Sequence, residues 1–220
     1  MRLSSIQEAV ATIRSGGMVI VTDSENRENE GDIVLAAQFA TPEKIAFITR
    51  HCTGIICAPM PGNIAERLEL PLMVEKNSEA MRTAFTVTVD VLQGTTTGVS
   101  AHDRAATLRA LADPSTTSKE LARPGHIFPL RARKGGVLER AGHTEASVDL
   151  CKLAEVYPVA VICELVNEDG TMSRLVDIDL VARAYGLPVI TIDALIAYRK
   201  LKLSVSSTLQ AELQQERCEA

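Results

Sequence analysis

Residues 23–32 are the most constraining stretch of the chain, because they place five carboxylates and one arginine in ten positions. The apolar runs 18–21 and 33–36 flank this stretch, and each has the composition of a buried strand. The sequence therefore predicts a strongly acidic loop that is held between two rigid apolar elements.

Three carboxylates of this loop have the spacing of one strand face. In an extended chain Glu28, Glu30 and Asp32 sit at positions i, i+2 and i+4, and their side chains point the same way. Because three carboxylates on one face repel each other, we expect a positive partner there: Arg27, a divalent cation, or both. A solvated hairpin loop is the alternative interpretation of the same charges.

The composition is that of one domain with an aliphatic core. The chain has 220 residues, of which 46% are hydrophobic and only 3% aromatic, so Val, Ile, Leu, Ala and Met must build the core. The net charge of −5, without a basic stripe, argues against a nucleic-acid partner. We expect a single catalytic domain over residues 1–203 and a tail, 204–220, that frays because it lacks a strong apolar face.

The cysteines and the apolar runs indicate the compartment. The five cysteines include no CxxC pair and no Cys/His spacing that suits a structural zinc, so we expect reduced, mostly buried thiols. The N-terminus has no apolar region of a signal peptide, and the longest apolar run, 158–163, is too short to span a bilayer. These features favour a cytoplasmic protein with no membrane partner.

Periodicity and capping residues predict mixed helices and strands without a strict βαβ order. Thr41, Ser100 and Asp193 are expected to cap helices. Residues 113–142, rich in Pro, Gly, Arg and Lys, show little periodicity and are expected to form an irregular segment that carries function. The predicted helices are 5–15, 42–52, 63–68, 101–112, 144–156, 174–185 and 194–203, and the predicted strands are 18–21, 33–36, 55–58, 84–90, 158–166 and 188–192. The expected fold class is α/β (α+β), a mixed parallel and antiparallel sheet packed by helices in layers within a single domain.

A helix start near residue 143 is the second candidate site. There a glycine precedes the helix, and the free backbone N–H groups and the helix dipole favour a bound phosphate. Arg140 and the Thr144 hydroxyl would add directed donors. His143 could instead be a neighbour of the helix cap with no role.

Three further residues could carry chemistry. Glu164 is the one charge inside the apolar run 158–166, where burial would favour its protonated form and suit acid–base catalysis; alternatively, it lies at a strand end and reaches water or pairs with an arginine. His126 could transfer protons near neutral pH, although a histidine in a loop is more often simply exposed. Cys57 ends a buried strand and is interpreted as a core thiol.

These features together predict a divalent metal, a phosphate site and two acid–base groups. That combination suits the enolisation of a phosphorylated carbonyl compound, in which a metal polarises the carbonyl while a carboxylate moves a proton.

Five motifs in this order resemble the signatures of the 3,4-dihydroxy-2-butanone 4-phosphate synthase family, and the resemblance covers residues 5–200. They are Asp23 with Arg27–Asp32, Thr96–Ala101, Arg123–His126, Gly142–Ala146 and Cys163–Leu165. The resemblance implies an enzyme of riboflavin biosynthesis that converts D-ribulose 5-phosphate to L-3,4-dihydroxy-2-butanone 4-phosphate and formate with Mg²⁺ (or Mn²⁺). It also implies a homodimer with active sites at the subunit interface.

The resemblance assigns roles to single residues. Glu28 and His143 match metal ligands, and Glu164, His126 and Glu30 match catalytic residues. The residues that match substrate contacts are Arg27, Glu28, Asp32, Arg140, Ala141, Gly142, His143, Thr144 and Glu164. Some family members carry a fused GTP cyclohydrolase II half with a cysteine-bound zinc, but here only Cys218 follows Cys163, so we expect that activity to be absent.

Two other interpretations remain open from the residues. A metal-dependent phosphosugar isomerase or aldolase would use the same enolisation but release no formate. A non-catalytic module that binds phosphometabolites or nucleotides would not need both Glu164 and His126. All metal-dependent interpretations require the Glu28 carboxylate and the His143 ring to lie within ~10 Å of each other, since metal ligands lie ~2–2.6 Å from their ion.

Overall fold

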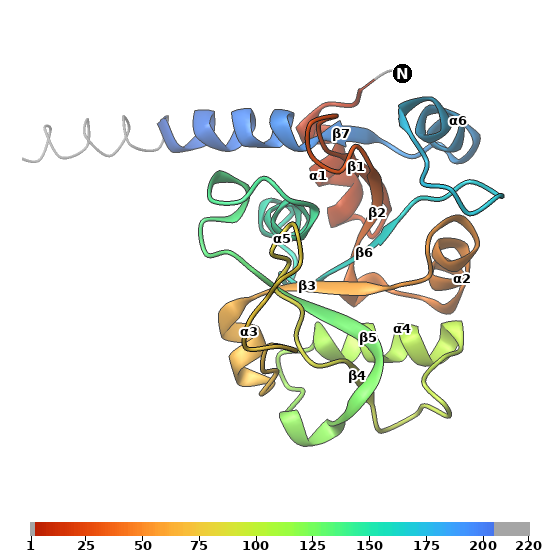
Figure 1. The fold of residues 1–220 in the computed structure, drawn as a ribbon, viewed down its shortest axis with the longest axis vertical. Coiled ribbons are helices and arrows are strands. Elements are labelled where there is room, and N and C mark those ends of the chain that lie inside the picture. The colour runs from red at the N-terminus through yellow and green to blue at the C-terminus, as the bar shows by residue number, and fades with distance from the viewer. Residues whose placement is uncertain (1–2, 205–220) are drawn as a thin grey trace, which may run out of the picture.

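The computed structural model describes residues 3–204, within which seven strands form one mixed sheet in the order β4-β5-β3-β6-β2-β1-β7 (Figure 1). The strands are β1 (Val19–Thr22), β2 (Gly31–Ala36), β3 (Cys57–Pro61), β4 (Val89–Val91), β5 (Leu121–Ala132), β6 (Ala160–Glu164) and β7 (Val189–Thr191). The pairs β1·β7 and β3·β5 are parallel, and the other four pairs are antiparallel. The predicted fold class, a mixed sheet packed by helices in layers, is confirmed.

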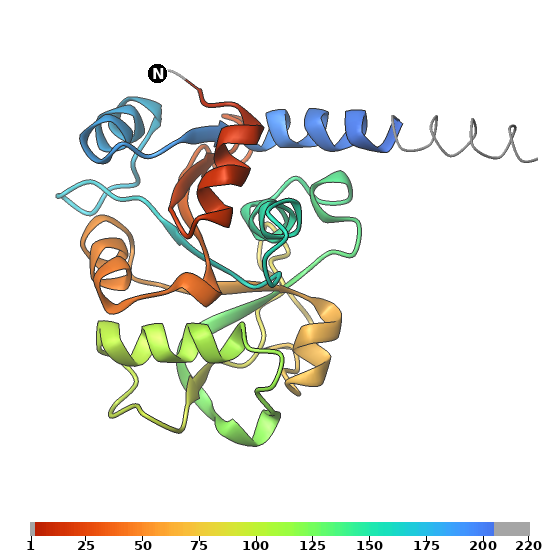
Figure 2. The ribbon, with the colours of Figure 1, turned by 180° about the vertical axis from the view of Figure 1, so that it is seen from behind.

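Helices cover both faces of this sheet (Figures 1 and 2). The helices are α1 (Ile6–Arg14), α2 (Pro42–His51), α3 (Gly62–Arg67), α4 (Ala101–Leu111), α5 (His143–Leu153), α6 (Leu175–Tyr185) and residues 192–204, with short 3₁₀ turns at Ala37–Phe39, Ser118–Glu120 and Gly136–Leu138. Apolar residues of α2, α3, α4 and α6 pack in one core cluster, and those of α1, α5 and residues 192–204 pack in the other. The sheet is therefore the middle of three layers.

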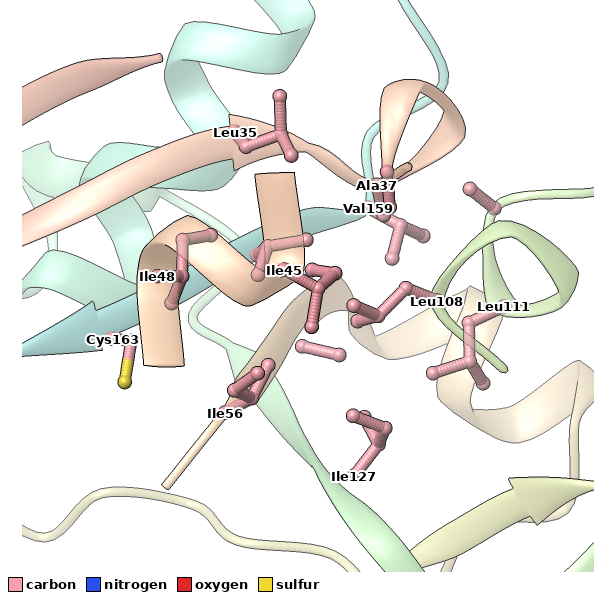
Figure 3. Close-up of a cluster of buried hydrophobic side chains, with 14 of the residues drawn as sticks. Leu35, Ala37, Ile45, Ile48, Ile56, Leu108, Leu111, Ile127, Val159 and Cys163 are labelled. Carbon is pink, nitrogen blue, oxygen red and sulfur yellow. The ribbon is translucent and has the colours of Figure 1, made fainter. Parts of the chain in front are cut away.

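The central strands are apolar at nearly every position because both of their faces are covered. In β1, Ile20 packs with the α2 and α4 cluster, whereas Val19 and Val21 pack with the α1 and α5 cluster. Figure 3 shows the first cluster, in which side chains of α2 such as Ile45 meet Leu108 of α4 over the sheet. No helix within residues 3–204 is long and apolar enough to cross a membrane.

The predicted strand–loop–strand unit is confirmed. β1 and β2 pair antiparallel from Val19 opposite Val34 to Thr22 opposite Gly31, and every residue of both strands is buried. The eight residues 23–30 connect them, so the acidic loop is held between two buried strands, as expected.

The main error of the sequence interpretation lies in residues 113–142. They contain the longest strand of the described chain, β5, which pairs with β3 on one side and β4 on the other. Pro124, Gly125 and Pro129 interrupt the strand pattern, and a proline in a central strand normally argues against a strand. The Pro129 carbonyl still accepts the Thr86 N–H at 3.0 Å, so the proline removes only one of the two bonds at this position.

Prolines also led to wrong predicted bounds for β3. The strand was expected at 55–58 and closed by the following prolines, but it runs through Pro59 to Pro61. The predicted strand 84–90 is only partly formed. β4 covers Val89–Val91, whereas Phe85 and Thr86 make single bridges to Leu130 and Leu72.

The capping predictions are confirmed at two helices and wrong at the third. The hydroxyls of Thr41 and Ser100 accept N–H groups at the starts of α2 and α4. The last helix begins at residue 192, and Thr191 rather than Asp193 accepts the Ala194 N–H, at 3.1 Å. The predicted tail after residue 204 lies outside the described residues.

Candidate active site

The antiparallel register of β1, β2 and β6 places the end of β1, the start of β2 and the end of β6 side by side at one end of these strands. β1 ends where β2 begins, and Asp32 of β2 lies opposite Glu164, the last residue of β6. A cavity of about 340 Å³ opens there. Eight of the predicted site residues line it, namely Arg27, Glu28, Glu30, Asp32, Arg140, His143, Thr144 and Glu164. Ala141 and Gly142 flank these residues at the start of α5.

Asp23 organises the acidic loop from its centre. Its carboxylate accepts the backbone N–H groups of Glu28 at 2.8 Å and Glu30 at 2.9 Å, and it accepts Arg27 Nη1 at 3.0 Å. Between the two backbone donors, Asn29 has a φ of 54°, a left-handed conformation that Asn tolerates better than most residues. The loop is thus folded around one buried carboxylate and is not an extended strand.

Arg27 is the positive partner that the clustered carboxylates were expected to need. Its Nη1 also donates to Glu28 Oε2 at 2.6 Å, so one guanidinium joins two carboxylates. Burial acts to raise the pKa of Glu28, but the hydrogen bond to His143 and the charge of Arg27 lower this pKa to about 2. Glu28 is therefore ionised at any physiological pH.

His143 is the first residue of α5 and is buried among carboxylates. Its Nδ1 lies 3.3 Å from Glu28 Oε2, and its Nε2 lies 4.0 Å from Asp32 Oδ1. Burial lowers the pKa of His143, but the carboxylates of Asp32, Glu28 and Asp23 raise it to about 9. The expected approach of Glu28 and His143 is confirmed, because the ring lies between the carboxylates of Glu28 and Asp32.

Asp32 is the most deeply buried carboxylate among the cavity residues. Burial raises its pKa to about 7; the imidazole of His143 opposes this rise, and the carboxylates of Glu164, Glu28 and Glu30 add to it. A side chain that can gain or lose a proton near neutral pH is suited to proton transfer. We expected this property of Glu164, but Glu164 is only half-buried, at the end of its strand.

The donor set fits a divalent cation. One ligand atom each from Asp23, Glu28 and His143 lies within 4.8 Å of the others. Asp32 Oδ1 and His143 Nε2 are buried without a hydrogen-bond partner in the described part of the chain, which is costly unless another group satisfies them. Because the Asp23 carboxylate already accepts three hydrogen bonds, Glu28 and His143 are better placed than Asp23 to bind a cation.

Arg140 has a role that the sequence did not reveal. Its guanidinium pairs with Glu145 Oε2 at 2.7 Å and donates to the Met81 carbonyl and the Thr83 hydroxyl, both at 3.1 Å. Met81 and Thr83 line the cavity, so Arg140 fixes a segment that covers the site. The buried Thr144 and the N–H groups of the first turn of α5 remain as donors for an anion.

Two residues of the sequence interpretation lie apart from this cluster. His126 is in β5 and does not line the cavity; its Nδ1 lies 2.6 Å from Asp90 Oδ2, and its side chain is half exposed. Cys57 does line the cavity, and burial raises the pKa of its thiol. Cys57 is therefore a neutral thiol, in agreement with its interpretation as a core residue.

Glu30 also lines the cavity and is half-buried. Burial and the charges of Glu28 and Glu164 raise its pKa, while Arg174 opposes them. Arg174 Nη1 also donates to the backbone carbonyls of Glu28, at 3.0 Å, and Asn29. Sequence reasoning missed Asp23 and Arg174 as residues that shape the loop, and only the membership of Asp23 in the acidic motif could have indicated its role.

The fold and site place the chain among layered α/β proteins in which a carboxylate–imidazole cluster that could hold a divalent cation lies beside a helix N-terminus. Residues 7–198 match the family model of 3,4-dihydroxy-2-butanone 4-phosphate synthase. The chain belongs to this family.

Individual relatives agree with the family model. A 3,4-dihydroxy-2-butanone 4-phosphate synthase of Agrobacterium fabrum is 52% identical over 200 residues, which are 91% of this chain and 94% of the relative. The Schizosaccharomyces pombe protein of the same name is 56% identical over 90% of this chain and 98% of its own length. A crystal structure of a 3,4-dihydroxy-2-butanone 4-phosphate synthase in complex with two magnesium ions superposes with a TM-score of 0.88 at 43% identity, covering 90% of this chain and 97% of that one.

Proposed function

We propose that this protein converts D-ribulose 5-phosphate to L-3,4-dihydroxy-2-butanone 4-phosphate and formate in riboflavin biosynthesis, with Mg²⁺ (or Mn²⁺) as cofactor. The observation that carries the proposal is the meeting of Glu28, His143 and Asp32 in one cavity, beside the start of α5. Family membership and the magnesium complex of a relative support the same reaction and the same cofactor.

The residues of this chain divide the work of binding. Glu28 and His143 would hold the cation, which when bound supplies a Lewis acid for the carbonyl and hydroxyl oxygens of the sugar. The N–H groups at the start of α5 and the Thr144 hydroxyl bind the phosphate. Arg27 and Asp32, which also line the cavity, contact the sugar.

Carboxylates of the cavity move the protons. Glu164 removes the proton at C3 to give an enediol, and Asp32 and Glu30 exchange protons with the neighbouring oxygens. Loss of the C1 hydroxyl as water, a skeletal shift, addition of water and release of C4 as formate complete the reaction. The water lost and the water added balance, so the substrate divides into the four-carbon product and formate.

His126 requires a second subunit in this proposal. It is catalytic in the family resemblance, yet it lies outside the cavity of its own chain and is half exposed. In a homodimer with sites at the interface, His126 of one subunit would complete the cavity of the other.

One assay tests the proposal against its rivals. The protein is incubated with ribulose 5-phosphate and Mg²⁺, and formate is measured with and without EDTA. We expect formate only with the metal. A phosphosugar isomerase would consume the substrate without formate, and a binding module would leave it unchanged.

Glu164→Gln should lower turnover by about 10²-fold or more, as expected when an acid–base group is lost; near-normal turnover would remove Glu164 from the reaction.

A further inference from the structure

Glu164 is held by a residue that no motif of the site contains. Thr53 follows directly after α2 and its cap, and its hydroxyl donates to Glu164 Oε2 at 2.7 Å. The backbone N–H of Thr53 donates to the main-chain carbonyl of Glu164 at 2.9 Å. Both the side chain and the backbone of Thr53 are thus joined to the same residue of β6.

The surroundings of the hydroxyl set the direction of its proton. Thr53 Oγ1 accepts the Ile55 N–H at 3.3 Å, within a turn in which Gly54 has a φ of 82°. Cys163 Sγ also lies 3.4 Å from Thr53 Oγ1, where either atom could donate, but the Glu164 carboxylate is the closer and stronger acceptor at 2.7 Å. The hydroxyl therefore donates its single proton to Glu164, and its oxygen accepts the Ile55 N–H. A bridge between Cys52 and Leu165 ties the same turn to the chain after β6.

Glu164 needs such a partner because its other neighbours repel it. Asp32 lies directly opposite on β2, and Glu30 is close enough for its own pKa to be raised by the charge of Glu164. Like charges at directly opposite positions of a sheet destabilise the pair. Within the described residues, the Thr53 hydroxyl is the only side chain that donates a hydrogen bond to the Glu164 carboxylate, and it leaves Oε1 without a donor.

We infer that Thr53 is a positioning residue, which holds the Glu164 carboxylate by Oε2 so that Oε1 faces the substrate. The inference rests on the proposed function, in which Glu164 takes the proton at C3. Without the hydroxyl, Glu164 turns away from Asp32 and Glu30 toward solvent, and the distance to the reacting carbon increases.

The test is Thr53→Val, which keeps the shape of the side chain and removes the hydroxyl. We expect kcat for formate release to fall by about 10- to 100-fold, as for a misplaced catalytic group, with KM within about twofold of wild type. Thr53→Ser restores the hydroxyl and should return kcat to within about threefold of wild type, which a purely structural role of the threonine methyl group would not do. Thr171→Val is the matched control and should leave kcat unchanged, since the Thr171 hydroxyl also donates to a carboxylate, that of Asp169 at 2.6 Å, and neither residue lines the cavity.

A double variant shows whether Thr53 acts through Glu164. Residues that act as one unit are not additive, so Thr53→Val should cause no further loss when it is added to Glu164→Gln. Magnesium binding measured by calorimetry should be unchanged in Thr53→Val, because Glu28 and His143 are not touched. If Thr53→Val changes the thermal unfolding temperature, the same measurements are made on Thr53→Ala, which has no branched side chain.

The outcomes separate this inference from the proposed function. Normal kcat in Thr53→Val together with an inactive Glu164→Gln overturns the role of Thr53 alone, and so does a further loss in the double variant. Normal turnover in Glu164→Gln overturns both the role of Glu164 and that of Thr53. A wild-type protein that releases no formate overturns the proposed function and, with it, this inference.

Discussion

Asp32 and His143 show how single side chains of the site depend on one another. The carboxylates around His143 raise its pKa to about 9, and burial beside other carboxylates raises the pKa of Asp32 to about 7. Because both pKa values are raised, both side chains favour the protonated form. A cation or a substrate that binds there would displace these protons. The arrangement costs folding stability, as buried charges at functional sites commonly do.

Replacement of Asp32 tests that cost. The pKa of Asp32 is about 7 in the folded protein and 3.8 as an isolated side chain, so its contribution to stability is present at low pH and is lost as the pH rises from 3.8 through 7. Asp32→Asn avoids this loss. From pH 5 to pH 8, the free energy of unfolding of Asp32→Asn should therefore increase by about 2 kcal/mol relative to that of the wild-type protein.

Urea denaturation without divalent cations at these two pH values measures the difference. Asp193→Asn, which changes an exposed carboxylate on the last helix, is the control and should show the same difference from wild type at both pH values. A constant difference for Asp32→Asn as well would show that Asp32 titrates in the folded protein as it does in solution.

At the residue scale, the sequence predicted the members of the site better than their roles. The charge density of the acidic loop and the helix start after Gly142 indicated Glu28 and the neighbourhood of His143. The sequence could not distinguish Asp32 from Glu164 as the buried carboxylate, because burial depends on the register of β2 against β6. It could not show that Asp23 folds the loop, since five carboxylates of one loop look alike until the backbone is placed.

At the scale of elements, close backbone contact between β4 and β5 supports the strand that carries His126. A Cβ atom added to Gly125 would overlap the peptide between Val89 and Asp90. The Gly125 N–H also donates to the Thr88 hydroxyl at 3.1 Å, and the next residue, His126, donates its N–H to Asp90. A glycine in a strand often marks such a close approach of another backbone.

Gly125→Ala should therefore destabilise the protein by about 3 kcal/mol, because backbone rather than a flexible side chain must move. The control is Gly62→Ala, where the new methyl group meets only the far end of the Arg131 side chain and the change should stay below about 1 kcal/mol. Thermal or urea unfolding of both variants measures the difference. Equal stabilities of the two variants would mean that β4 and β5 can separate at little cost.

The same elements explain where the fold prediction failed. Strands without proline, such as β1 and β2, and helices with clear caps, such as α2 and α4, were predicted close to their observed bounds. β3 and β5 were not, because Pro59, Pro61, Pro124 and Pro129 act as signals to end a strand when only local sequence is considered. Their positions are tolerated through pairing with distant segments, which the sequence does not show.

At the scale of the whole molecule, the site lies at one end of the strands β1, β2 and β6 and leaves His126 outside. The described chain brings the carboxylate–imidazole cluster, the start of α5 and Glu164 to one cavity, and His126 lies half exposed outside that cavity. A symmetric dimer would use each of these features twice, once in each site.

Mixing two inactive variants tests this arrangement. If His126 acts on the partner, a heterodimer of His126→Ala and Glu164→Gln subunits has one intact site and one with both defects. Random exchange of subunits makes half of the dimers mixed, so about a quarter of wild-type formate release should return. Light scattering of the wild-type protein should give the mass of a dimer. Mixtures that stay inactive after complete exchange would place His126 in the site of its own chain. A His126→Ala variant that keeps its activity when assayed alone would place His126 outside the reaction.

The tie between Arg27, Asp23 and Glu28 has a consequence for ion selectivity. A monovalent ion that enters the loop carries no more charge than the guanidinium it would have to outcompete, and it lacks the tether that keeps the arginine in place. If the site binds a cation as proposed, sodium and potassium would gain nothing by exchange, whereas a doubly charged ion would. Arg27 would then favour divalent over monovalent ions, and its hydrogen bonds to Asp23 and Glu28 hold the loop together without an ion.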